Sequence, residues 1–305
     1  MQKQTKGIIY ASLTAFLWGF LAIALKVAVR EVSPQTIVWF RFTIAFLLLA
    51  LWHVIYKPKE FKILIRPPLL LVLAALALSW NYLGFMLGIH YTSPSNAQLF
   101  IQSGPITLAL AGIIIFKERL GRMQIVGFVI AIVGLVFFYK QQIQTFIGAE
   151  TRYSTGVLLT LSGAMAWAIY AALQKKLVQK TPGSTLNLFL FGFPALAYLP
   201  FIDLTPFLHL SFGWWLLMIF LGLNTLLAYT FLAKALEHTE ANKVSIIIIL
   251  NPLITFVTMG VLSHMQVSWI DGENFTLLSI LGAVILLIGA LLVVKKKRSN
   301  GLSSK

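Results

Sequence analysis

The feature that most constrains this chain is a run of about twenty apolar residues, which recurs along its whole length. A helix of that length crosses the hydrocarbon layer of a bilayer. Only 11% of the residues are charged, against about a quarter in soluble domains. We therefore predict an all-α polytopic membrane protein with ten transmembrane helices, at about 7–29, 34–56, 68–90, 94–116, 121–139, 154–178, 184–203, 211–237, 241–263 and 276–295.

The net charge of +15 is distributed unevenly among the connecting segments. If the N-terminus is cytoplasmic, 19 of the 24 lysines and arginines lie in cytoplasmic segments, as the positive-inside rule requires. Topology therefore explains the basic excess, and no nucleic-acid partner is expected. We predict a multi-pass protein of the plasma (inner) membrane with both termini cytoplasmic, whose first span is retained and is not a signal peptide.

The sequence lacks the residues that most catalytic and metal sites need. It has no cysteine, which excludes disulfides, thiolate metal sites and cysteine nucleophiles. The carboxylates and histidines fall in predicted loops or at helix ends, so no proton relay crosses the membrane and no cluster has metal-ligand spacing. We expect no enzyme activity, no metal and no cofactor.

The two halves of the chain resemble each other. The segment GIIYASLTAFLWGFLAIALKVAV at 7–29 aligns with GVLLTLSGAMAWAIYAALQKKLV at 156–178, and this alignment pairs Trp18 with Trp167. Further along the chain, later spans pair Tyr82 with Tyr229 and Pro105 with Pro252.

Each half contains five predicted spans, and an odd number places the halves in opposite orientations. We therefore predict two inverted five-helix repeats, residues 1–148 and residues 149–305, the second ending in a basic cytoplasmic tail. Inverted repeats are typical of secondary transporters, because two such copies can exchange inward-open and outward-open arrangements.

Three stretches carry a family resemblance: VWFRFTIAFLLLA at 38–50, KERLGRMQIVGFVIAIVG at 117–134 and NPLITFV at 251–257. In their order and topology they resemble the EamA-type drug/metabolite transporter superfamily. The resemblance implies a central cavity built from helices 1–4 and 6–9, with helices 5 and 10 at the edges. It also implies transport of amino acids, other metabolites or drugs, often outward. One departure is Glu118, which has Met265 at the equivalent position of the second half.

Polar residues interrupt the fourth predicted span, in SPSNAQLFIQSGPI at 93–106. The segment YTSPSN predicts an external turn. Gln98 and Gln102 are four residues apart and share one helical face, and Pro105 frees a backbone carbonyl. Polar groups at membrane depth are tolerated against protein or a wet cavity. These residues therefore either line a transport pathway or hydrogen-bond a neighbouring helix, and Pro105 and its repeat mate Pro252 are predicted hinges.

Most of the remaining predicted binding residues lie near the middle of their spans or are paired by the repeat, and Arg41 lies about a third of the way down the second span. Tryptophan usually gathers at membrane interfaces, so a midplane pair either bounds a site for an apolar or aromatic solute or fills space. Neutral amides and phenols suit a zwitterionic or hydroxylated solute, with packing as the alternative. Arg41 is the cation well inside a span and either attracts a substrate carboxylate or contacts backbone carbonyls. The full set is Trp18, Arg41, Asn81, Tyr82, Gln98, Gln102, Trp167, Asn224, Tyr229 and Asn251.

Together these features predict a carrier of small organic metabolites, amino-acid-like or otherwise zwitterionic, that works by alternating access in export or exchange. Its expected partners are the small-molecule substrate and the lipid bilayer, and it is expected to be a monomer or a weak homodimer. Two alternatives remain open: a proton-coupled drug efflux carrier and a non-transporting membrane sensor.

Overall fold

The computed structural model describes residues 3–92, 94–140, 143–144, 151–269 and 276–294. The predicted turn residue Ser93, the boundary between the halves at 148/149 and the basic tail from residue 295 lie outside these ranges.

Every regular element within the described ranges is helical, as the apolar runs predict. The α-helices are α1 (Lys3–Ala28), α2 (Pro34–Tyr56), α3 (Lys62–Ile65), α4 (Leu69–Tyr91), α5 (Pro94–Ile101), α6 (Ser103–Ile114), α7 (Arg122–Phe138), α9 (Thr151–Leu177), α10 (Gly183–Ala197), α11 (Phe212–His238), α12 (Ala241–Ile248), α13 (Asn251–His264) and α14 (Leu277–Val294). Short 3₁₀ helices follow α2 and α10: η1 (Pro58–Phe61), η2 (Leu199–Phe201) and η3 (Thr205–Leu208).

Nine helical segments of the described chain are long and apolar enough to cross a membrane, so the protein is a multi-pass membrane protein. The one predicted span not among these nine is the fifth, at 121–139, which corresponds to α7, an apolar helix of 17 residues. At 1.5 Å per residue α7 is about 26 Å long, slightly short of the ~30 Å hydrocarbon layer. A tenth crossing therefore stays a prediction.

Two of the spans are each broken near the middle. In the first half, the break between α5 and α6 falls at Gln102, and in the second half the break between α12 and α13 falls at Ile249 and Leu250. A proline follows each break, Pro105 in α6 and Pro252 in α13. Proline lacks the N–H that the carbonyl four residues earlier would accept, so the helical hydrogen bonding is interrupted there. The prolines therefore lie where the sequence predicts a loosened backbone, and their action as hinges stays a prediction.

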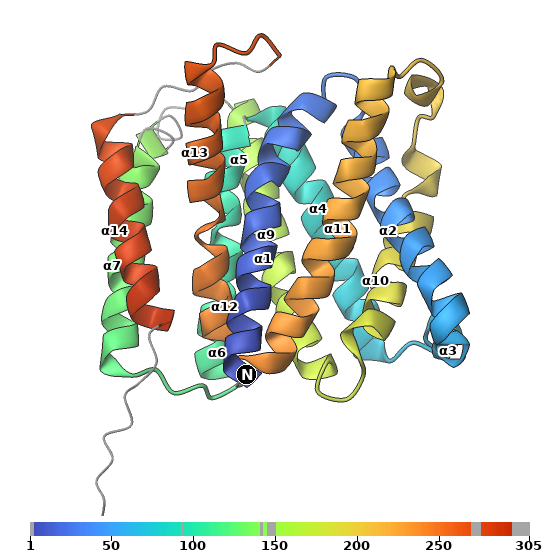
Figure 1. The fold of residues 1–305 in the computed structure, drawn as a ribbon, viewed down its shortest axis with the longest axis horizontal. Coiled ribbons are helices and arrows are strands. Elements are labelled where there is room, and N and C mark those ends of the chain that lie inside the picture. Colours follow the sequence, from blue (N-terminus) through green and yellow to red (C-terminus); the bar gives the residue numbers. More distant parts are fainter. Residues whose placement is uncertain (1–2, 93, 141–142, 145–150, 270–275, 295–305) are drawn as a thin grey trace, which may run out of the picture.

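The helices of one half pack mainly against those of the other (Figure 1). α4 lies along α9 and α1 along α11, while α2 also contacts α11 and α10 contacts α4.

At one edge of the molecule α7 and α14 run side by side (Figure 1), where the family resemblance places helices 5 and 10. Their backbones approach closely at Gly127, Gly134, Gly282 and Gly289. A methyl group on Gly134 would fall on the backbone of Leu286. Small residues at such seams allow the close packing that replaces the hydrophobic effect between helices in lipid.

Glu60 anchors the connection between α2 and α4. Its carboxylate accepts a hydrogen bond from the Thr185 hydroxyl of α10, and it lies 3.2 Å from both Lys57 Nζ and His53 Nε2. Burial raises the pKa of Glu60, but hydrogen bonds from Thr185 and Lys57 and the positive charges of Lys57 and His53 outweigh burial. The net result is a pKa below the ordinary value of 4.5.

Candidate functional site

A cavity of about 80 Å³ lies between the helices of the two halves. Nine of the ten predicted binding residues and the predicted hinge Pro105 line it. Its complete lining is Trp18, Leu21, Ala22, Arg41, Asn81, Tyr82, Phe85, Gln98, Ile101, Gln102, Pro105, Trp167, Tyr229, Ile248 and Asn251. Residues separated by more than 200 positions thus share one wall, because the halves pack face to face.

Three amide side chains join the two broken spans across the cavity. Gln98 Nε2 and Gln102 Nε2 both donate hydrogen bonds to Asn251 Oδ1, at 3.1 and 3.0 Å. All three residues are buried. Gln102 Oε1 is buried and has no hydrogen-bond partner among the described residues.

Aromatic rings form a second part of the wall. The rings of Trp18 and Trp167, one from each half, meet edge to face with centroids 5.9 Å apart. Tyr229 lies 5.4 Å from Trp18 and 5.8 Å from Tyr82 by the same measure. Such contacts fix the ring orientations, and an aromatic face attracts a cation.

Arg41 supplies the positive charge of the site. Arg41, on α2, is only 2% exposed, and its Nε donates a hydrogen bond to Thr225 Oγ1 of α11 at 3.1 Å. The guanidinium carbon lies 4.5 Å from the centre of the Tyr82 ring. Within the described ranges no carboxylate forms an ion pair with Arg41. A buried cation with neutral contacts is suited to an anionic group that binds from the cavity.

The match to known proteins decides the family. The model of the EamA-like transporter family matches residues 5–140 and 154–295, which is most of the chain. The chain belongs to the EamA-like transporter family. This confirms the resemblance predicted from the sequence and with it the assignment as a membrane transporter.

Relatives of this EamA protein cover nearly its whole length. An uncharacterized transporter of Haemophilus influenzae is 32% identical, over 95% of this chain and 95% of that protein. The uncharacterized inner membrane transporter YhbE of Escherichia coli K12 is 31% identical, over 95% of this chain and 91% of its own length. A probable amino-acid metabolite efflux pump of Salmonella typhimurium is 25% identical, over 92% of this chain and 91% of that protein.

A solved crystal structure superposes on this EamA protein with a TM-score of 0.73 at 16% sequence identity. The superposition covers 95% of this chain and 97% of the other, and at that identity it shows the fold alone.

Two predicted residues lie outside the cavity of this EamA protein. Asn224 is buried, and its Nδ2 donates to the carbonyl of Leu17 at 2.7 Å, so it acts as a link between α11 and α1. Pro252 is buried beside Asn251 but does not line the cavity. Asn81 lines the cavity and also links two helices, because its Nδ2 donates a hydrogen bond to the carbonyl of Gly163 at 3.0 Å.

Sequence reasoning missed Thr225, the hydrogen-bond partner of Arg41. A single threonine inside an apolar helix carries no pattern that distinguishes it from a threonine bonded to its own helix. Thr225 is in fact bonded both ways, since its hydroxyl also donates to the carbonyl of Leu221 at 3.1 Å. The aliphatic lining residues were missed for a similar reason, because a lipid-facing residue is equally apolar.

Proposed function

We propose that this EamA-family transporter is a carrier of small organic carboxylates, above all amino-acid-like zwitterions, and that it works by alternating access. The observation that carries the proposal is Arg41, a buried cation at the cavity wall whose described contacts are neutral. A charge-assisted, two-pronged hydrogen bond from a guanidinium is best matched by a carboxylate.

The rest of the wall suits the other end of a zwitterion. Gln102 Oε1 is an unused acceptor for an ammonium group, and the faces of Trp18, Trp167 and Tyr229 attract cations. At about 80 Å³ the cavity is smaller than the ~300–1,000 Å³ of most ligand sites, which favours a small solute. The name of the Salmonella relative, a probable amino-acid metabolite efflux pump, supports this substrate class and the outward direction.

Alternating access rests on an inverted repeat of ten spans, with α7 as the fifth. Three observations support it. The family model matches two successive stretches, 5–140 and 154–295. Exchange of the halves turns the pair α4–α9 into α11–α1, and both pairs pack closely. Each half also contains one broken span followed by a proline.

We propose facilitated movement or solute exchange in preference to proton coupling. The six carboxylates of the described ranges all lie at helix ends or in connections, whereas proton relays use carboxylates inside the membrane. The six are Glu31, Glu60, Glu118, Asp203, Glu237 and Glu240.

Counterflow in proteoliposomes tests the proposal. Vesicles loaded with an unlabelled amino acid should take up the labelled form faster than empty vesicles, whereas a channel or a sensor gives no such stimulation. Amides of the same amino acids, in which a neutral amide group replaces the carboxylate, should fail to compete. If amides and parent carboxylates compete equally, the substrate assignment is wrong. Uptake that follows an imposed pH gradient and collapses with a protonophore would favour the proton-coupled alternative.

A further inference from the structure

Besides the amide link at the cavity, the described residues of the two broken spans pack closely at one end of the molecule only. α6 packs against α12 at the end where the N-terminus lies (Figure 1). Exchange of the proposed repeats turns this pair into α13 and α5, but the described residues of those two helices make no comparable contact. The structure is therefore closed between α6 and α12 and looser at the opposite end.

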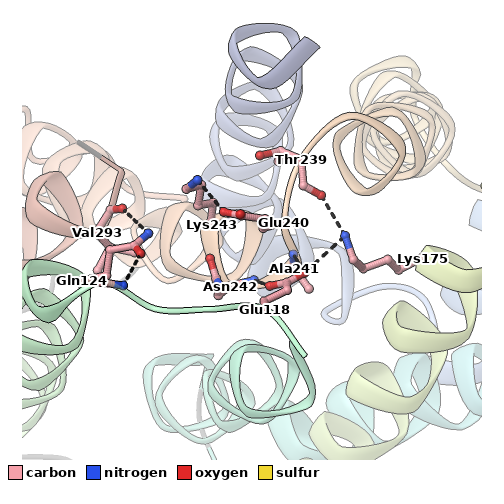
Figure 2. Close-up of polar contacts among 10 residues, drawn as sticks. Glu118, Gln124, Lys175, Thr239, Glu240, Ala241, Asn242, Lys243 and Val293 are labelled. Carbon is pink, nitrogen blue, oxygen red and sulfur yellow. Dashed lines mark hydrogen bonds and ion pairs between the residues drawn. The ribbon is translucent and has the colours of Figure 1, made fainter. Parts of the chain in front are cut away.

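Glu118 lies at the closed end, just beyond α6 (Figure 2). Its Oε1 accepts a hydrogen bond from the backbone N–H of Ala241 at 2.7 Å, and its Oε2 accepts one from Asn242 at 3.1 Å. These N–H groups belong to the first two residues of α12. At this end a helix leaves its N–H donors without partners in the helix and carries a partial positive charge. The carboxylate thus joins the first half of the chain to the first turn of a second-half helix.

Lys175 of α9 completes this contact (Figure 2). Its Nζ lies 3.4 Å from Glu118 Oε1 and donates to the carbonyl of Thr239 at 2.8 Å. The same ammonium lies 5.5 Å from the centre of the Phe116 ring. The side chains of Lys175 and Glu118 are 13% and 7% exposed, so water screens their attraction less than at an open surface.

Within the part of the chain that the structure describes, the fold is adapted to this contact at the α6–α12 end. A methyl group on Gly112 of α6 would lie 2.7 Å from Glu118 Oε2, so the carboxylate sits directly on the helix backbone. Lys117, before Glu118, has φ 53°, and in the second half Gln266 has φ 50°. Aligned on these left-handed residues, Glu118 pairs with Val267, whereas the sequence alignment pairs it with Met265. Neither Val267 nor Met265 is acidic, so the opposite end has no carboxylate at either position.

We infer that Glu118, bound to the start of α12 and to Lys175, is the latch that holds the α6–α12 end of the carrier closed. Opening this end separates α6 from α12, which breaks both hydrogen bonds to α12. Glu118 does not line the cavity and acts as a positioning residue that sets the balance between the two open states. The inference rests on the proposed carrier function, so its test must not depend on transport.

Distances between spin labels provide that test. Because the chain has no cysteine, Ile115→Cys and Glu237→Cys introduce the only two labelling sites. Both positions are exposed, one at the end of α6 and one near the end of α11, next to α12. Double electron–electron resonance in nanodiscs should give a dominant short distance and a minor long one for the otherwise unchanged protein. Glu118→Gln should raise the ratio of long to short distances about tenfold, because charge-assisted hydrogen bonds are about twice as strong as neutral ones.

Glu240→Gln is the matched control, since Glu240 pairs with Lys243 of the same helix and that ion pair joins no separate elements. It should leave the distances unchanged. Lys175→Met is the second test variant and should act like Glu118→Gln. A folded Glu118→Gln or Lys175→Met protein with an unchanged ratio of the two distances, or an equal opening in Glu240→Gln, would overturn the latch. If the distances shift as expected but the unsubstituted protein shows no counterflow, the proposed function fails and the latch stands.

Discussion

Replacement of Arg41 by methionine separates a substrate contact from a structural one. In the folded protein the guanidinium gains a charged hydrogen bond to Thr225, worth about 1.5–3 kcal/mol, and a contact with Tyr82, worth about 2 kcal/mol. Against these gains stands a desolvation cost of several kcal/mol for a buried cation. Methionine has a similar length and no such cost, so Arg41→Met is expected to leave the stability of the apo protein nearly unchanged or to raise it.

Binding should respond in the opposite direction. Loss of even one charge-assisted hydrogen bond to a substrate carboxylate removes about 1.5–3 kcal/mol. At 1.4 kcal/mol per factor of ten, the dissociation constant should rise about 10- to 140-fold. Arg41→Lys keeps the charge without the planar guanidinium fork, so its dissociation constant should lie between those of the unsubstituted protein and Arg41→Met.

Thermal unfolding of the purified protein measures both effects. The midpoint without ligand reports stability, and its rise with an amino acid at increasing concentration reports affinity, because a ligand that binds only the folded state stabilises it. The result that would refute the reasoning is a large loss of apo stability in Arg41→Met together with an unchanged ligand-induced rise. Arg41 would then be a structural residue and the substrate carboxylate would bind elsewhere.

Three further predictions concern other parts of the molecule. Asn251→Leu removes the shared acceptor of the amide cluster and should reduce counterflow at least tenfold while membrane expression stays near normal; loss of the protein itself would favour a packing role. Thr185→Val should raise the pKa of Glu60 toward 4.5. A carboxylate whose pKa is lowered in the folded protein stabilises the fold at pH values above its pKa in the unfolded chain, and this stabilisation is lost as the pH falls through its pKa in the folded protein. Acid unfolding should therefore begin at a higher pH in Thr185→Val. Thermal scans from about pH 3 to pH 7 would reveal this shift, and an unchanged dependence of the unfolding midpoint on acidic pH would contradict the prediction. A reporter fused at Lys305 should be cytoplasmic and one inserted at Ala149 external, and the reverse at both sites would overturn the predicted orientation.

The sequence was sufficient to predict the helices of the described ranges. Runs of apolar residues predict the spans, and the proline at position 105 predicts a disturbed helix where the break occurs. Trp18 and Trp167, which the sequence alignment pairs at equivalent positions of the two predicted repeats, lie in contact in the structure.

The rotation of each helix was harder to predict. Asn224 and Thr225 are neighbours at the same depth, yet one bonds to α1 and the other to Arg41. In a soluble protein the polar face would indicate which side turns outward, but lipid accepts the same apolar side chains as the core. On α4, exposed Leu73 and buried Leu78 are indistinguishable by residue type. The bond from Gln98 and Gln102 to one oxygen of Asn251 therefore required the structure.

The glycine seam between α7 and α14 has a consequence for how the protein is made. Translation delivers the first half before the second, and α14 follows every other described helix. On the predicted ten-span topology, the glycine face of α7 enters the bilayer before its partner is synthesised, and lipid covers Gly127 and Gly134 until α14 arrives. By then the helices that line the cavity have all been inserted. On that topology the seam closes only after every other described helix has been synthesised.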